Sequence, residues 1–235
     1  MGEDYGKALN RLEDERLEYK ITQGKMGKML KMTQSHYYKA ANGEKRFGYY
    51  ELQAMCNSEL DVYHIFTGKR SRRKDYFDAL FWEADYEQLL VCLKIIHMVA
   101  GANKRAGADA KEWERIFKDT HYIEYALYII AEEQNVFKAV RTYKGIKQMD
   151  MAEALAMDVK KLRALESNHI LPDSELIFKM YGSYGVSPAL FLKDAKCLQN
   201  EICFLTDSVG EKVQQKLIDC VKFALSNSLV SVVLN

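Results

Sequence analysis

The sequence predicts an all-α protein that contains two similar helical bundles, and three observations support this prediction. The 235 residues include only two prolines, Pro172 and Pro188, so long stretches lack helix breakers. Apolar residues make up 48% of the chain, which is enough for packed cores and argues against extensive disorder. Two segments, approximately residues 8–69 and 136–193, show the same order of apolar stripes and turn residues.

In the first segment, short helices alternate with turn residues. Thr22 is placed to cap a helix that begins at Gln23, because its hydroxyl can accept a hydrogen bond from an unpaired backbone N–H. Thr33 caps the next helix, residues 34–41, which ends at Asn42-Gly43, two residues that tolerate the left-handed conformation. The expected core comprises Met26, Met29, Leu30, Tyr37, Ala40, Leu52, Met55, Val62, Ile65 and Phe66.

The second segment repeats this plan. Asp158 caps the third helix, and Ser167-Asn168 supplies the left-handed stop. The inward residues are Met151, Ala152, Leu155, Leu162, Leu165, Leu176, Ile177 and Met180. The spacing of the two segments agrees without gaps. In the first segment Gln23 is followed by Met26, Thr33, Tyr37 and Gly43. In the second, Gln148 is followed at the same intervals by Met151, Asp158, Leu162 and Asn168. This agreement indicates an internal duplication.

The rest of the chain is also expected to be helical. We predict four parts: an N-terminal bundle over 1–71, a helical spacer over 72–135, a second bundle over 136–194, and a C-terminal helical extension over 195–235. The spacer is rich in large apolar residues at helical spacing, beginning with Phe77, Leu80, Phe81 and Ala84, which indicates a packed unit instead of a flexible linker. The apolar tail 229–234 is expected either to dock on the body or to pair with a second subunit in a homodimer.

Composition and missing motifs argue against several classes of protein. No apolar run reaches the ~18 residues needed to span a bilayer, and the charged N-terminus lacks an apolar signal core, so we expect a cytoplasmic protein without a membrane partner. The five cysteines are scattered, which is typical of core thiols. His97 is expected to be a partnered core or edge residue. Nucleotide-binding and catalytic motifs are missing, so we expect neither an enzyme nor a cofactor or metal site.

Charge is segregated along the chain. Residues 1–74 hold 15 Lys and Arg against 10 Asp and Glu, whereas residues 75–135 hold 6 against 12. Residues 136–235 hold 13 against 11, so both ends are basic and the middle is acidic. A polyanionic partner would be attracted to the ends, above all to the first.

Both segments resemble the Cro/repressor-type (xenobiotic-response-element) helix-turn-helix domain of phage repressors and many bacterial regulators, and together they cover about half the chain. The matching motifs are Ile21-Thr22-Gln23-x-x-Met26-Gly27, Tyr37-x-x-Ala40-x-Asn42-Gly43 and Ile65-Phe66-Thr67-Gly68-Lys69 in the first, and Arg141-x-x-Lys144-Gly145-Ile146-x-Gln148-x-x-Met151-Ala152 and Leu162-x-x-Leu165-Glu166 in the second. Four features depart from the family pattern: Gly27 replaces Ala, Ala41 replaces Glu, the stretch around Ser58 is one residue short, and Asn168 replaces Gly. These departures leave open whether both copies bind DNA.

The resemblance implies a double-stranded DNA partner and a set of reading residues on each third helix, which lies in the major groove in such domains. In the first copy it implies base-edge contacts from Thr33, Gln34, Ser35, His36, Tyr38 and Lys39, a phosphate contact from Gln23, and backbone contacts from Asn42, Lys45 and Arg46. In the second copy it implies Lys160, Lys161 and Arg163, with Gln148 at the phosphate position. The alternative for each side chain is a plain solvated helix face.

Two functions from different classes follow. The first is a sequence-specific transcriptional regulator, most simply a repressor, which acts as a monomer with two readers or as a dimer with up to four. The second is a protein-interaction adaptor, similar to an antitoxin, in which the helix-turn-helix domains bind a partner protein. The basic run 69–74 is either a phosphate-contacting arm or a solvated linker. In a third reading, the aromatic-rich middle region senses a small molecule or peptide.

Overall fold

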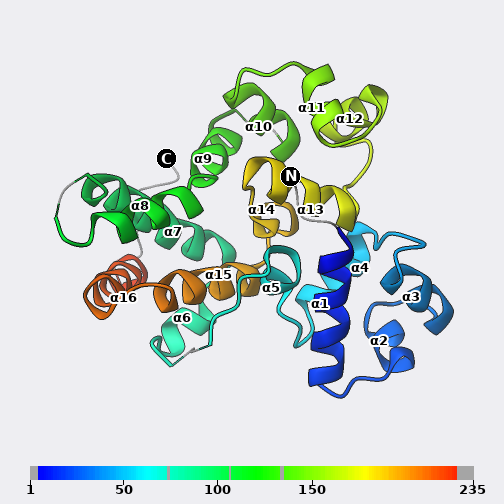
Figure 1. Ribbon diagram of the computed structural model, residues 1–235, viewed down its shortest axis with the longest axis horizontal. Coiled ribbons are helices and arrows are strands. Elements are labelled where there is room, and N and C mark those ends of the chain that lie inside the picture. The colour runs from blue at the N-terminus through cyan, green and yellow to red at the C-terminus, as the bar shows by residue number, and fades with distance from the viewer. Residues whose placement is uncertain (1–4, 73–74, 106, 133–134, 227–235) are drawn as a thin grey trace.

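The computed structural model describes residues 5–72, 75–105, 107–132 and 135–226, and every regular element in these ranges is a helix (Figure 1). The prediction of an all-α protein is therefore confirmed for the described chain. The helices are α1 (Tyr5–Glu18), α2 (Gln23–Met29), α3 (Gln34–Ala41), α4 (Tyr49–Cys56), α5 (Val62–Thr67), α6 (Ala79–Glu83), α7 (Tyr86–Asn103), α8 (Ala110–Asp119), α9 (Ile123–Glu132), α10 (Val136–Tyr143), α11 (Gln148–Ala154), α12 (Val159–Glu166), α13 (Ser174–Tyr184), α14 (Pro188–Leu192), α15 (Ala195–Asp207) and α16 (Glu211–Ser226).

The helices α1–α5, here called the first repeat, recur as α10–α14, the second repeat. The helices α2 and α11 begin at Gln23 and Gln148, so the two repeats are offset by 125 residues, and α3 and α12 keep this offset at both ends. The left-handed residues recur at the same offset, in the pairs Lys20 and Gly145, Lys31 and Ala156, Gly43 and Asn168, and Gly68 and Lys193. Because left-handed backbone is rare outside glycine, four matched positions show that the two repeats share one backbone path.

The predicted caps are present. The hydroxyl of Thr22 accepts a hydrogen bond from Lys25 N, and that of Thr33 accepts one from His36 N, each at 3.2 Å. Asp158 caps α12 by accepting from Lys160 N at 2.6 Å. The turn between α2 and α3 is closed by a bond from Met32 N to the Gly27 carbonyl (2.8 Å). These bonds satisfy the otherwise unpaired N–H groups at the helix starts and fix the angle between successive helices.

The two repeats pack on each other reciprocally. The fourth helix of the second repeat, α13, contacts α5, and its fifth helix, α14, contacts both α4 and α5. Each repeat thus offers its fourth and fifth helices to the other, and α13 also contacts α1. Polar contacts join the same surfaces: Phe47 N donates to the Ser174 hydroxyl (3.2 Å), and Ser174 N donates to the Phe47 carbonyl (2.9 Å).

The spacer helices and the C-terminal helices form one packed unit. Helix α7 contacts α8, α9, α15 and α16, and α15 also contacts α5 of the first repeat. Buried apolar residues of both repeats and of these helices belong to one continuous core. The extension 195–226 therefore packs against the spacer, whereas the apolar tail 229–234 lies outside the described residues. Figure 1 shows this unit on the left and the repeats on the right.

One expected helix is shorter than its apolar spacing indicates. The pattern from Phe77 to Ala84 predicts a continuous helix, but α6 covers only Ala79–Glu83, and Leu80 is 47% exposed. Ala84 is in an extended conformation because Asp85 begins α7 with a capping box that includes the Gln88 side chain. The strong local cap of the following helix overrides the apolar periodicity.

The expectation for His97 is confirmed. Its ring is buried, stacks on Phe117 at 4.4 Å, and makes hydrogen bonds with Thr120 (2.9 Å) and Glu124 (3.3 Å). Burial, the larger effect, lowers the pKa of His97, although the Glu124 carboxylate opposes this shift. The cysteines are free thiols, and all except the half-buried Cys220 are buried.

Candidate nucleic-acid interface

Helices α2 and α3 lie across each other with a close backbone approach at Gly27. A Cβ atom at this position would lie 3.0 Å from the Met32 carbonyl oxygen and 3.2 Å from Gln34 N. The second repeat has Ala152 at the equivalent position and keeps the bond from Met157 N to the Ala152 carbonyl (2.9 Å). The family departure at Gly27 therefore leaves this turn intact, and glycine suits the close backbone approach there.

The outward face of α3 is not covered by the rest of the molecule. Tyr37 and Ala40 are fully buried, which orients the opposite side of the helix toward solvent. The expected base-reading residues are accordingly exposed, apart from the half-buried His36; the exposed ones are Thr33, Gln34, Ser35, Tyr38 and Lys39. Within the described chain, the side chains of Gln34, Ser35 and Lys39 form no hydrogen bond or ion pair, so they are available to a ligand.

The residues expected to contact phosphate surround this face. Gln23 is half-buried at the start of α2, and Asn42 and Lys45 are exposed beyond the end of α3. Arg46 is exposed as well, but its guanidinium forms an ion pair with Glu175 of the second repeat and donates to the Gly43 carbonyl (2.7 Å). Arg46 thus joins the two repeats in addition to lying near the reading face.

Sequence reasoning missed most of the charge around α2 and α3. Residues 20–46 hold seven Lys and Arg against one Glu, and all seven cations are exposed: Lys20, Lys25, Lys28, Lys31, Lys39, Lys45 and Arg46. Four of these lysines lie on or beside α2, where the family motif assigns no reading role. A count over the helix pair, instead of over residues 1–74, would have found this concentration. Such a positive surface attracts a polyanion.

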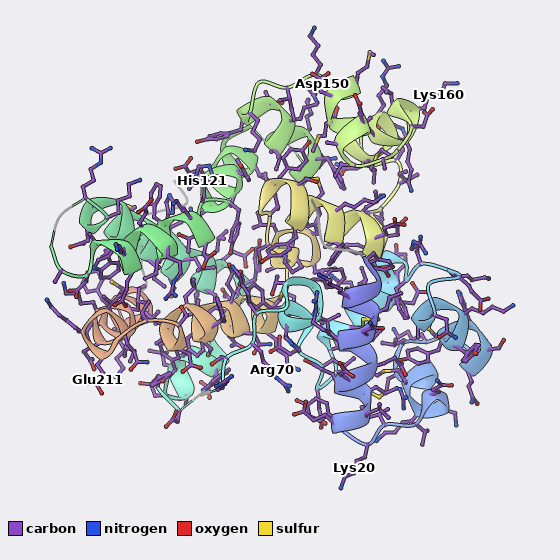
Figure 2. All side chains as sticks on the ribbon, viewed as in Figure 1. Lys20, Arg70, His121, Asp150, Lys160 and Glu211 are labelled. Atoms are coloured by element: carbon purple, nitrogen blue, oxygen red, sulfur yellow. The ribbon has the colours of Figure 1, made fainter. Side chains whose placement is uncertain are left out.

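The equivalent stretch of the second repeat is electrically balanced. Residues 145–171 hold four Lys and Arg and four Asp and Glu. Lys160, Lys161 and Arg163 are exposed on α12 as expected, but Lys161 lies 3.5 Å from Asp173, and Arg163 donates to the Gln148 side chain (3.1 Å). Of these three cations, only Lys160 has a side chain that forms no hydrogen bond or ion pair within the described chain, and Figure 2 shows it projecting outward.

Gln148 is held by a partly buried ion pair inside the second repeat. Its amide donates to Glu166 Oε2 (2.7 Å), and Arg141 donates to both carboxylate oxygens of Glu166. In the first repeat Ala41 stands where the second has Glu166, and Arg16 pairs instead with Glu13 of its own helix at 2.8 Å. Arg16 also donates to the Ile21 carbonyl, two residues before Gln23. Arg141 likewise donates to the Ile146 carbonyl, two residues before Gln148. The departure at Ala41 is thus compensated within α1.

Two cations of the basic run that begins at Lys69 are engaged by the protein itself. Lys69 pairs with Asp119 at 2.8 Å, and Arg70 makes a two-pronged contact with Glu18. Arg73 and Lys74 lie outside the described residues. In this conformation the described part of the run ties the first repeat to the spacer, which disfavours a free phosphate-contacting arm.

Comparison with families of known proteins, with curated proteins and with solved structures finds no match for this chain. None of the helices in the described ranges combines the length and hydropathy of a membrane-crossing segment. In the same ranges, no cluster of three or more His, Cys, Asp or Glu side chains is arranged to hold a metal ion. The exposed, cationic surface of α2 and α3 is the candidate functional site.

Proposed function

We propose that this protein is a sequence-specific DNA-binding regulator whose first repeat is a helix-turn-helix reader. The observation that carries the proposal is the α2–α3 surface, which combines an exposed row of polar side chains with seven exposed cations. Gln34 can bond adenine with both amide atoms, and Lys39 can reach the acceptors of guanine. The lysines around them supply the non-specific attraction to phosphate that DNA readers require.

The second repeat serves as the pseudo-two-fold partner of the first. Helices α3 and α12 lie on the side of the molecule away from α8 and α16 (Figure 1), and the reciprocal contacts of α4, α5, α13 and α14 relate them as in a dimer. Dimeric readers place their half-sites about one DNA turn apart. A single chain would then contact a site with one strongly bound half, under α3, and one weaker half, under the electrically balanced α12.

Selection from a random duplex library, followed by fluorescence anisotropy on the enriched duplex, tests the proposal. The double variant Gln34→Ala, Lys39→Ala should weaken binding by about 100-fold, because each base contact contributes ~1–3 kcal/mol. The matched control Gln215→Ala, Lys222→Ala removes the same residue types from exposed positions of α16 and should leave affinity unchanged. The logarithm of affinity should fall with the logarithm of salt concentration with a slope of about −4, as for several phosphate contacts.

A protein partner is the second candidate function, and one observation favours it for the second repeat alone. The α11–α12 surface is electrically balanced, and Met149 on α11 is 71% exposed. Such a surface suits a protein interface better than phosphate. If the library yields no preferred duplex, or if binding is insensitive to salt, the DNA-reading proposal fails and this alternative takes its place.

A further inference from the structure

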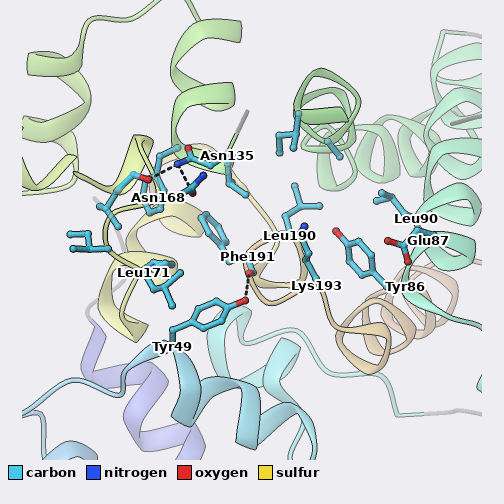
Figure 3. Close-up of a pocket in the computed structure, with 17 residues that line it drawn as sticks. Tyr49, Tyr86, Glu87, Leu90, Asn135, Asn168, Leu171, Leu190, Phe191 and Lys193 are labelled. Atoms are coloured by element: carbon cyan, nitrogen blue, oxygen red, sulfur yellow. Dashed lines mark hydrogen bonds between the residues drawn. The ribbon is translucent and has the colours of Figure 1, made fainter. Parts of the chain in front are cut away.

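A cavity of about 510 Å³ lies where the two repeats meet the spacer (Figure 3). It is lined by residues from α4, α7, α9, α10 and α14 and from the segment that follows α12, and most of the lining side chains are apolar or aromatic, such as Leu90, Phe137 and Leu190. Cavities that hold small molecules in proteins have volumes of ~300–1,000 Å³ and this kind of lining. The cavity therefore has the size and character of a binding site for a small, largely apolar molecule.

The polar groups of the cavity are few. Figure 3 shows Lys193 between Leu190 and Tyr86, with Glu87 beyond Tyr86, and the amides of Asn135 and Asn168 on the opposite side of the cavity from Glu87. The Tyr49 hydroxyl, also in the lining, donates to the Phe191 carbonyl (3.2 Å). Lys193 forms no ion pair within the described chain. Lys193 is exposed, and an unpaired ammonium group on the wall of an open apolar cavity is complementary to a molecule with an anionic head and an apolar body.

The backbone of Lys193 is left-handed, as is that of Lys20, Lys31 and Ala156 at other helix ends. It ends α14 in the left-handed conformation, with φ 48° and ψ 48°, where the first repeat has Gly68 with φ 71°. A left-handed lysine is less stable than glycine by ~1 kcal/mol, and the local fold needs only the backbone shape. This conformation follows from the backbone path that the two repeats share.

The side of the cavity with Asn135 and Asn168 is connected to α12. The Asn135 side chain caps α10 by accepting from Lys138 N (3.0 Å), and its amide donates to the Leu165 carbonyl and to Asn168 Oδ1 (3.1 Å). These bonds hold the last turn of α12 and its left-handed stop at Asn168. A molecule that fills the cavity would touch both asparagines and so would alter how firmly α12 is held.

We propose that this cavity binds an amphipathic organic acid in its anionic form, with Lys193 as the head-group partner, and that its occupancy regulates DNA binding. The regulatory half rests on the proposed function, whereas the binding half does not. By thermodynamic linkage, the ligand and DNA must change each other's affinity by the same factor.

Two dyes with the same apolar body test the binding half on the full chain. The probes are 1-anilinonaphthalene-8-sulfonate, which is anionic, and N-phenyl-1-naphthylamine, which is neutral; their fluorescence reports binding. Lys193→Met should weaken binding of the anionic dye by about fivefold and leave binding of the neutral dye unchanged. Glu87→Gln should strengthen binding of the anionic dye, because it removes a nearby like charge. Leu171→Trp, at a lining position that is 48% exposed, should exclude both dyes. Lys222→Met, on exposed α16, is the matched control and should change neither.

Saturable one-to-one binding with this pattern, and displacement of the anionic dye by decanoate, supports the site. Equal affinity of Lys193→Met and the unaltered chain for the anionic dye overturns it. The site is also overturned if dye binding appears only after the chain is shortened to end at Ser226, because the apolar tail would then be the natural occupant of the cavity. The regulatory half requires at least a fivefold change in anisotropy-measured DNA affinity with saturating decanoate. No change overturns that half, and failure of DNA binding itself leaves the dye result standing.

Discussion

The carboxyl group of Glu201 makes the stability of this protein depend on pH in a direction opposite to that of most carboxylates. Glu201 lies on α15, is 2% exposed, and accepts hydrogen bonds from the hydroxyls of Tyr122 and Ser187, each at 2.8 Å. Burial raises the pKa of Glu201 to about 7 from its ordinary value of 4.5, although the two hydroxyl bonds oppose this shift. The folded protein therefore holds a proton that the unfolded chain releases between pH 4.5 and pH 7.

In this window the folded state binds more protons than the unfolded state, so the free energy of unfolding falls as pH rises from 4.5 to 7. Because one pKa unit corresponds to 1.36 kcal/mol, the loss above pH 7 is about 3 kcal/mol. Glu201→Gln stays neutral at every pH, and its amide oxygen can accept both hydroxyl bonds. We expect this variant to be more stable than the unaltered protein by about 3 kcal/mol at pH 8 and nearly equal to it at pH 4.5.

Urea unfolding followed by circular dichroism at half-unit intervals from pH 4.5 to pH 8 measures the difference between the two proteins. Glu153→Gln, which neutralises an exposed carboxylate on α11, is the control and should keep the pH dependence of the unaltered chain. If Glu201→Gln keeps the same slope between pH 5 and pH 7, or is the less stable protein at pH 8, the buried carboxyl does not control this dependence.

Three further predictions concern the repeats. Ala156→Gly should raise the free energy of unfolding by about 0.5–1 kcal/mol in the same urea assay, because Ala156 is exposed and left-handed with φ 50°; a destabilised variant would contradict the backbone described for this turn. Glu166→Ala should lower the free energy of unfolding by about 2–4 kcal/mol, because the substitution leaves the partly buried Arg141 without its partner. A loss under ~0.5 kcal/mol would show that the pair is solvated. Lys28→Ala should reduce the salt slope of DNA binding by about 0.9, with little effect on the preferred duplex sequence; an unchanged slope would remove Lys28 from the phosphate contacts.

Much of each repeat could be predicted from local sequence. The caps at Thr22, Thr33 and Asp158 and the left-handed stops at Gly43 and Asn168 lie where the sequence predicts them. Each of these bonds closes over two or three residues, so the residue types present decide it almost alone. The outward position of Gln34 and Lys39 was predictable for the same reason, since burial of Tyr37 and Ala40 on a short helix fixes the opposite face.

Other features of the candidate site required the structure. Arg46 and Lys69 are both basic residues near the predicted reader, yet each is paired with a carboxylate that is distant in sequence, Glu175 and Asp119 respectively. No local pattern distinguishes them from Lys39, which forms no such bond in the described chain. Which lysines and arginines remain available for DNA therefore depends on where the second repeat and the spacer pack.

The sequence alone determined the all-helical class, the duplication and the path of each repeat, because helix starts, stops and apolar stripes arise from interactions within a few residues. Only the tertiary structure decided that the repeats face each other through their fourth and fifth helices, that α15 and α16 pack on the spacer, and that a cavity remains at their junction. Those features depend on how well whole surfaces fit across more than 100 residues of chain. Complementarity of shape between distant surfaces leaves no periodic trace in the sequence.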